Sequence, residues 1–493
     1  MKLSREEFLT KKSFHFSWKF VTEKDLMEVF VLLYDLLVYL DKLYLYEHLQ
    51  VIIRELLNNS CRAIAKRVFF EENQIDISNP VEYEENLIFF RISVLEKWDA
   101  YRETIENSRY KIDLYVNWKE DEIEILVISN TVLLDIEKQR IQNRLNSSEK
   151  YKTIIDAYRE HSDSKESAGL GILMCILLLR SMGLSKESLS IESKENQTIS
   201  RVFIPKHVIP PETISLIYEK VTKEVKMLPS LPESLQRIIK ICNSPDMDMK
   251  KLIDEIEKNP AVSADILKLS NSVGYLNRSK PDDLSIAVKK LGSNGVLRMI
   301  YAISTIRIMN SRYSRMEEEW EHARRTSYYA ERLAYENGLT KIADTIGVGA
   351  LLHDIGKILL LSIEPSIFPS IMELAKNRAL ENSKVVEEIS LGVSHSEIGY
   401  MLARKWNFPE DLTYIIAGHH QPWNVPEEFI ELTETVYLAN MMTHYLKKDI
   451  SFYNINFNIL SKYKIFTAEE LEEKVSLYET SFRKEEKLRG INA

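Results

Sequence analysis

The sequence predicts a multidomain protein, in which an α/β sandwich is followed by an all-helical domain. The chain has 493 residues, which is too long for one hydrophobic core. Runs typical of strands are confined to the first 206 residues, whereas apolar residues recur at helical spacing from about residue 226 to about residue 485. We therefore place an α/β domain at 15–206, a linker at 207–225 and an all-α domain at 226–485.

The elements of the first domain follow from changes in the apolar pattern. Residues 26–70 have helical spacing and predict two helices, and residues 134–166 form a polar helix-and-loop region. A long apolar helix is expected at 168–183. Runs of β-branched or aromatic residues predict strands at 87–95, 111–118, 123–129, 188–193 and 198–205. Helices and strands in this order favour an α/β sandwich.

Composition and charge exclude several classes of protein. The formal net charge is -9 and no long basic run occurs, so extensive nucleic-acid binding is not expected. Cys61, Cys175 and Cys242 lack the spacing of a disulfide framework or a zinc site, which favours a reducing cytoplasm. The N-terminus lacks the apolar core of a signal peptide, and the most apolar stretches are too short or too interrupted by charge to span a bilayer.

The stretch LLHDIGKILL, residues 351–360, combines an apolar helix pattern with His353, Asp354 and Lys357. On one helix these three side chains would share a face. Five of the ten histidines lie between positions 322 and 420, which supports a shared site; they are His322, His353, His395, His419 and His420. Glu318 lies one helical turn before His322 and is expected on the same face.

Imidazoles and a carboxylate together suit Zn, Fe, Mn or Ni, and one carboxylate can bridge two ions. Two adjacent ions can clamp a phosphodiester and generate hydroxide at neutral pH. The alternative is structural: His353 and Asp354 would be hydrogen-bonded to neighbouring helices, and Lys357 would reach solvent along its aliphatic stem. We expect the whole set to form one polar site.

Several segments of the helical domain resemble the HDOD domain, the HD-related output domain of bacterial signalling proteins. They are LPSLPESLQRIIKICNSP, KNPAVSADILKLSNSVGY, LSIAVKKLGSNGVLRMI, LLHDIGKILL, LGVSHSEIGYMLARKWNFP and IAGHH. The resemblance implies the fold of HD phosphohydrolases, including the HD-GYP cyclic-di-GMP phosphodiesterases. It implies a divalent metal (Fe, Mn, Zn or Mg) with ligands Glu318, His322, His353, Asp354, His395, His419, His420 and Asn440. Asp354 and Lys357 would then be catalytic, with Lys357 contacting the scissile phosphate.

The sequence departs from the hydrolase pattern in two places. Asn440 stands where the hydrolases have an aspartate, and an amide oxygen brings no negative charge to a metal. No GYP motif follows GHHQPW, so the substrate-recognition loop of the phosphodiesterases is missing.

In the first domain, ELLNN places Glu55 and Asn59 on one helical face, and SAGLGI places Gly169 and Gly171 before an apolar helix. Free backbone N–H groups at such a helix start could receive phosphate oxygens; close packing is the alternative. The order of these motifs is similar to the GHKL fold of histidine kinases and gyrase-type ATPases. That resemblance implies Mg²⁺ and ATP at these four residues, although Ser129 and Thr131 replace the adenine-reading aspartate and the next glycine.

Two main functions remain open from the sequence, and ATP-gated switching through Glu55 and Asn59 is a third possibility. One is a cytoplasmic regulator, in which an ATPase-like domain controls an HDOD output module that binds signalling proteins or a nucleotide second messenger, with a homodimer as one assembly. The other is a metal-dependent phosphodiesterase acting on a cyclic dinucleotide or another nucleotide.

Overall fold

The computed structural model describes residues 11–119, 122–148, 150–151, 154, 169–205, 216–270, 283–313, 316–363, 371, 373, 375 and 383–488. The chain divides into two compact units, and each is described by itself. The first comprises Met1–Thr213 and Glu388–Ser390, and the second comprises Ile214–Glu387 and Leu391–Ala493. Residues 207–215 of the predicted linker and residues 155–166 of the predicted helix-and-loop region lie outside the described residues.

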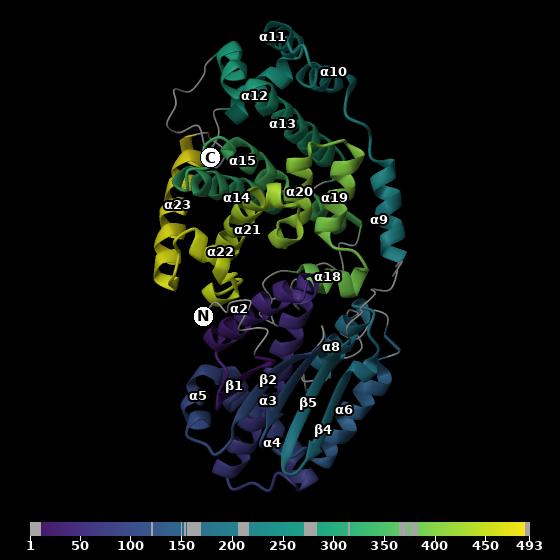
Figure 1. Cartoon of the computed structure of the whole chain (residues 1–493), viewed down its shortest axis with the longest axis vertical. Helices are drawn as coiled ribbons and strands as arrows, with labels where there is room; N and C mark the ends of the chain where they lie inside the picture. The colour runs from purple at the N-terminus through teal and green to yellow at the C-terminus, as the bar shows by residue number, and fades with distance from the viewer. Residues whose placement is uncertain are drawn as a thin grey trace. The chain divides into compact units, whose positions relative to one another are not determined.

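The first unit contains a five-stranded antiparallel sheet with helices (Figure 1). Its elements are β1 (Ser13–Trp18), α2 (Glu23–Tyr39), η1 (Leu43–Leu45), α3 (Tyr46–Glu72), α4 (Pro80–Ser93), η2 (Leu95–Lys97), α5 (Trp98–Glu106), β2 (Ile112–Lys119), β3 (Glu122–Ser129), α6 (Asp135–Ser147), α8 (Gly169–Ser181), η3 (Lys186–Ser188), β4 (Leu189–Lys194) and β5 (Gln197–Ile204). The strand order is β1-β2-β3-β5-β4.

One face of the sheet forms the core of this unit. In β3, Ile123, Ile125 and Val127 are fully buried and alternate with half-buried residues, the pattern of a sheet covered on one side. Helix α3 packs against β2 and β3, and α8 packs against α3. The apolar sequence of α8 follows from its position in this core, since a helix that is apolar all round is normally buried.

The two predicted helices between residues 26 and 70, the helix at 168–183 and four of the five predicted strands are confirmed. The strand predicted at 87–95 is wrong, because these residues belong mainly to helix α4. Asn79 caps that helix by accepting a hydrogen bond from the backbone N–H of Val81 (3.0 Å), and Pro80 occupies its first turn. These start signals outweigh the strand propensity of the following apolar residues. Strand β1 was not predicted.

A buried ion pair holds α6 against α3. Both carboxylate oxygens of Glu137 accept from the Arg67 guanidinium, the shorter contact being 2.6 Å, and Lys66 lies 3.3 Å away. Burial by itself would raise the pKa of Glu137, but the charges of Arg67 and Lys66 and the hydrogen bonds outweigh it, and the pKa is lowered.

Replacing Glu137 with glutamine should therefore destabilise the first unit by about 2 kcal/mol at pH 7. Because the folded-state pKa is the lower one, the stabilisation is present above the pKa of the unfolded chain and is lost as pH falls through the folded value. Urea denaturation at pH 7 and pH 4 checks this. The difference in free energy of unfolding between wild type and variant should be smaller at pH 4 than at pH 7. Asp135→Asn, which removes an exposed carboxylate from the same helix, is the control; an equal loss in both variants would contradict the prediction.

The described secondary-structure elements of the second unit are all helices, and the helix Lys384–Leu391 includes Glu388–Ser390, which group with the first unit (Figure 1). Its elements are α9 (Leu216–Met227), α10 (Glu233–Cys242), α11 (Met249–Glu257), α12 (Pro260–Ser270), α13 (Leu284–Arg312), α14 (Glu317–Glu336), α15 (Ala343–Leu352), α16 (Ile355–Ile363), α18 (Lys384–Leu391), α19 (His395–Lys405), α20 (Glu410–Gly418), η4 (Pro422–Asn424), α21 (Glu427–Leu446), η5 (Phe452–Asn454), α22 (Phe457–Lys462) and α23 (Ala468–Leu488). Helix α14 packs against α15 and α21, while α19 packs against α16 and α20.

The apolar stretch Ala343–Ile363 is long and apolar enough to cross a membrane by length and composition, but 67% of its 18-residue apolar window is buried within the protein. The chain also turns at His353 and Asp354, between α15 and α16, so the expectation of one continuous helix through LLHDIGKILL is wrong. These features are those of core helices. The turn places His353 and Asp354 between two helix ends.

Candidate metal centre

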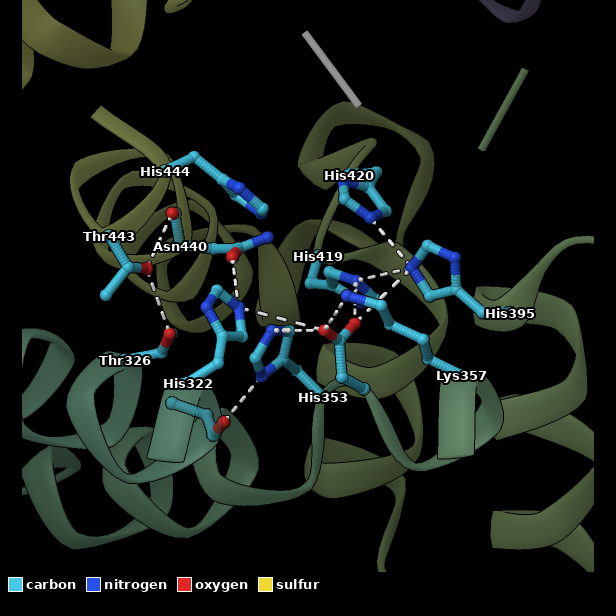
Figure 2. A network of polar contacts seen from close by, with 12 residues as sticks. His322, Thr326, His353, Lys357, His395, His419, His420, Asn440, Thr443 and His444 are labelled. Atoms are coloured by element: carbon cyan, nitrogen blue, oxygen red, sulfur yellow. Dashed lines mark hydrogen bonds and ion pairs between the residues drawn. The ribbon is translucent and has the colours of Figure 1, made fainter. Parts of the chain in front are cut away.

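A buried cluster of imidazoles surrounds one carboxylate in the helical unit (Figure 2). Two groups have ligand atoms within 4.8 Å of one another, and Asp354 belongs to both. The first group is Asp354, His395, His419 and His420, and the second is His322, His353 and Asp354. All six residues are at most 6% exposed.

Helix ends and helix interiors both contribute to the cluster. His353 and Asp354 occupy the turn between α15 and α16, His395 is the first residue of α19, and His419 and His420 directly follow α20. His322 lies inside α14. The packing of these helices therefore gathers residues that are far apart in the sequence.

The two oxygens of Asp354 face different imidazoles. Its Oδ2 lies 3.5 Å from Nε2 of His353 and 3.7 Å from Nε2 of His322. Its Oδ1 lies 3.4 Å from Nε2 of His395 and 3.5 Å from Nε2 of His419. This division is what a carboxylate that bridges two neighbouring cation positions requires.

The cluster has more acceptors than protons. His353 donates Nδ1–H to the carbonyl oxygen of Ala350 (2.6 Å), and His419 donates Nδ1–H to that of Ile416 (2.9 Å). A neutral imidazole has one N–H, so the Nε2 atom of each ring carries a lone pair that points toward the carboxylate. Nε2 of His353 has no hydrogen-bond partner in the part of the chain that the structure describes. A divalent cation would relieve this repulsion, and the donor set therefore fits one.

The charge states agree with this arrangement. Burial lowers the pKa of His353 to about 4 and holds the pKa values of His322 and His420 well below their usual range. Burial alone would raise the pKa of Asp354, but His353 and Lys357 outweigh it and hold that pKa well below the ordinary value. Burial likewise lowers the pKa of His419, so four of the five imidazoles favour the neutral form in which they bind metals, whereas the pKa of His395 is shifted the other way.

The side chain of Asn440 on α21 hydrogen-bonds to the ring of His322. Its Oδ1 lies 3.0 Å from Nε2 of His322, the nitrogen that also faces Asp354. Whichever way the amide is oriented, this contact uses Nε2 as a donor or as an acceptor. The Thr443 hydroxyl donates to the backbone carbonyl oxygen of Asn440 (2.7 Å), in the same turn of α21. The His322 side of the cluster is therefore the weaker candidate for a metal.

Glu387 on α18 is a buried partner of the cluster that the sequence did not indicate. Its carboxylate accepts from the backbone N–H of His395 (2.7 Å), from Nδ1 of His395 (2.7 Å) and from the Ser383 hydroxyl (2.7 Å). Burial alone would lower the pKa of His395, but the charge of Glu387 outweighs it and raises that pKa. The one available signal is a glutamate eight residues before a histidine, which is too common to single out.

The structure does not gather every predicted residue of this set. Glu318 is exposed on α14 and belongs to neither group. Lys357 lies beside the cluster on α16, with Nζ 3.8 Å from Oδ2 of Asp354. Its predicted contact with a scissile phosphate and the catalytic role of Asp354 stay predictions.

The predicted nucleotide residues lie on two helices of the first unit. Glu55 and Asn59 are on α3, where Glu55 is 1% exposed and Asn59 is half-buried, while Gly169 and Gly171 are in the first turn of α8. The hydroxyl groups of Ser129 and Thr131 are 2.8 Å apart and hydrogen-bond to each other. ATP and Mg²⁺ binding at these positions stays a prediction.

The helical unit thus buries one carboxylate among five imidazoles, a set of groups whose chemistry suits a divalent metal. Residues 228–422 match the family described as the HDOD domain, and the chain therefore contains an HDOD domain. The match covers the predicted core of the helical domain but not the first unit, whose GHKL resemblance stays a prediction.

The chain is also similar to several individual proteins. It is 28% identical over 441 residues to an uncharacterized protein of Treponema pallidum (strain Nichols), covering 89% of this chain and 86% of the relative. An HDOD domain protein of Geobacter sulfurreducens is similar at 20% identity with a TM-score of 0.41, over 54% of this chain and 94% of that one. A Shewanella amazonensis SB2B protein provisionally described as a phosphohydrolase is similar at 20% identity with a TM-score of 0.40. The similarity covers 52% of this chain and 93% of that one.

Proposed function

We propose that this chain is a signalling regulator whose HDOD domain binds one divalent metal ion at the buried histidine–aspartate cluster. The observation that carries the proposal is the gathering of one carboxylate and three buried imidazoles, Asp354, His395, His419 and His420, with ligand atoms within 4.8 Å of one another. The ion would be held by Asp354, His395, His419 and His420 and would supply the missing positive charge. Control of this domain by the first unit is part of the proposal as an expectation from the sequence.

One ion is expected rather than two because of Asn440. Its amide engages Nε2 of His322, so the second group keeps only His353 and the shared Asp354 as unengaged ligands. Two-metal hydrolysis needs both positions. A regulatory role for the bound ion is therefore favoured over catalysis.

The test is metal content per chain after anaerobic purification of the full-length protein. Wild type should contain about one ion, and Asp354→Ala should contain almost none because the shared carboxylate is lost. Asp265→Ala, which removes a half-exposed carboxylate from the same unit, is the control and should keep the ion. Wild-type protein with less than about a tenth of an ion, even after incubation with Fe²⁺, Mn²⁺ or Zn²⁺, would overturn the proposal.

Hydrolysis of a cyclic dinucleotide is the second candidate function. The position of Lys357 beside Asp354 favours it, since an ammonium near a bridging carboxylate can contact a phosphate oxygen. Turnover that requires metal and disappears in Asp354→Ala but not in Asp265→Ala would establish it. Absence of turnover in protein that carries the ion would leave the regulatory role.

A further inference from the structure

Helix α9 (Leu216–Met227) belongs to the second unit but precedes the residues that match the HDOD domain, which begin at 228. It is the first described helix after Thr213, where the N-terminal part of the first unit ends. Helix α9 packs against α16 and α19 (Figure 1). Both of these helices begin at the metal cluster, because Asp354 directly precedes α16 and His395 is the first residue of α19.

Two hydrogen bonds tie the C-terminal end of α9 to the end of α19. The Lys405 ammonium donates to the carbonyl oxygen of Lys226 (2.8 Å). Nε1 of Trp406 donates to the carbonyl oxygen of Pro229 (3.1 Å), directly after α9. Lys405 is the last residue of α19 and Trp406 is its C-cap. Because a helix moves as one rigid element, a displacement of α9 is passed along α19 to His395.

Glu224 anchors α9 to the end of α13. Its carboxylate accepts from Nε of Arg312 (2.7 Å) and from the Tyr313 hydroxyl (2.9 Å). The hydrogen bond from Arg312 lowers the pKa of Glu224, so the carboxylate is charged at neutral pH. Glu224 borders the buried side of α9, where Val221 and Val225 are 0% and 7% exposed. This ion pair therefore sets how α9 is rotated about its axis.

The contact between α16 and α19 transmits such a displacement. The two helices meet backbone against backbone at Gly356 and Gly399. Side chains at this contact are too small to absorb a movement, so a displaced neighbour changes the separation or tilt of the helices as whole elements. That separation determines the distance between Oδ1 of Asp354 and Nε2 of His395, which is 3.4 Å in this structure.

We propose that α9 is the element through which the first unit controls the metal cluster, with Glu224 as a positioning residue for His395. While α9 is held in place, α16 and α19 keep Asp354 and His395 close enough to bind one ion together. A change in the first unit that draws on the chain before α9 loosens these contacts, and the affinity for the ion falls. By thermodynamic linkage, ion binding holds α9 in place in return. This inference rests on the proposed metal site, but the positioning of α19 can be measured in metal-free protein.

Hydrogen exchange of the metal-free, full-length protein tests the positioning role. Glu224→Arg places like charges together at the end of α13. It should speed exchange at the start of α19 about tenfold, including the His395 amide, which donates to Glu387. Asp265→Arg is the matched control, because it breaks an ion pair with Arg307 of the same helix α13 but lies on α12. Equal exchange of α19 in the two variants would overturn the proposal.

Charge exchange separates the ion pair from a general loss of structure. The double variant Glu224→Arg, Arg312→Glu restores opposite charges at the end of α13 and should return the exchange of α19 to near the wild-type rate. A double variant whose α19 exchanges as fast as that of Glu224→Arg would contradict a positioning role for the pair.

Titration with Mn²⁺ or Zn²⁺ then connects α9 to the ion. Glu224→Arg should raise the dissociation constant about tenfold, whereas the double variant and Asp265→Arg should bind as wild type does. Wild type that binds the ion no more tightly than Glu224→Arg would overturn this inference and leave the proposed metal site intact. Wild type that binds neither ion would instead count against the proposed function, and the exchange measurement alone would decide the role of α9.

Discussion

Replacing Gly356 with alanine should destabilise the helical unit by about 3 kcal/mol and abolish metal binding. An alanine Cβ at this position would lie 1.9 Å from the carbonyl oxygen of His395 and 2.6 Å from the backbone nitrogen of Gly399. Both atoms belong to the backbone of α19, so no side-chain rotation relieves the overlap. Helices α16 and α19 would have to separate, which would move His395 away from Asp354.

Thermal unfolding and metal content of the purified variant check this prediction. Gly295→Ala is the control, because an added Cβ there lies 3.1 Å from Cβ and 3.3 Å from Cδ2 of Leu291, across the kink at Gly292, and its nearest atoms belong to no other helix. Alanine is the better helix former, so the control should lose little stability and keep its metal. A Gly356→Ala protein with wild-type melting and a full complement of metal would show that the close approach of the helices is not needed.

The order of helices in the second unit could be predicted from the sequence because its apolar periodicity is long and regular. The gathering of the histidines was expected from their clustering between positions 322 and 420, and the structure brings all five of them close to Asp354. What periodicity could not show is the turn at His353 and Asp354. Periodicity also could not show the close approach of Gly356 to α19, which is distant in the sequence.

The errors in the first unit have a similar origin. Residues 87–95 have the composition of a strand, but Asn79 and Pro80 start a helix that continues through them. An exposed apolar side such as that of α4 is easily read as strand, since composition does not reveal which side chains meet a partner.

In the second unit, sequence spacing alone did not predict the burial of Glu318. Its spacing from His322 is correct for one helical face, yet the side chain lies at the surface.

Asp354 connects the fold to the proposed function. Its oxygens face imidazoles from several different helices. The carboxylate and these imidazoles could therefore bind one ion together only when the helices are packed against one another. A bound ion would therefore stabilise the folded arrangement by the free energy of binding. This coupling between helix packing and ion binding is what a regulatory module needs to convert metal occupancy into a change of its surface.

Replacing Glu387 with glutamine should weaken metal binding about 10- to 100-fold while leaving the fold intact. The carboxylate is fully buried and accepts Nδ1–H from His395, which leaves Nε2 of that ring as the lone-pair atom that faces Asp354. Glutamine can still accept one hydrogen bond from His395 and can donate to the Ser383 hydroxyl. It cannot supply the negative charge that makes the imidazole a stronger donor to a cation.

Metal titration of the metal-free protein, together with thermal unfolding of that protein, separates positioning of His395 from a general loss of structure. Glu255→Gln is the matched control, because Glu255 in the same unit is also mostly buried and ion-paired, with Arg237 and Lys258, but lies on α11 outside the cluster. Glu387→Gln should weaken the metal complex far more than the control does, with similar melting of the two metal-free variants. If both variants bound metal as tightly as wild type, the proton held between Glu387 and His395 would have no influence on the ligand nitrogen, and His395 would not be a ligand.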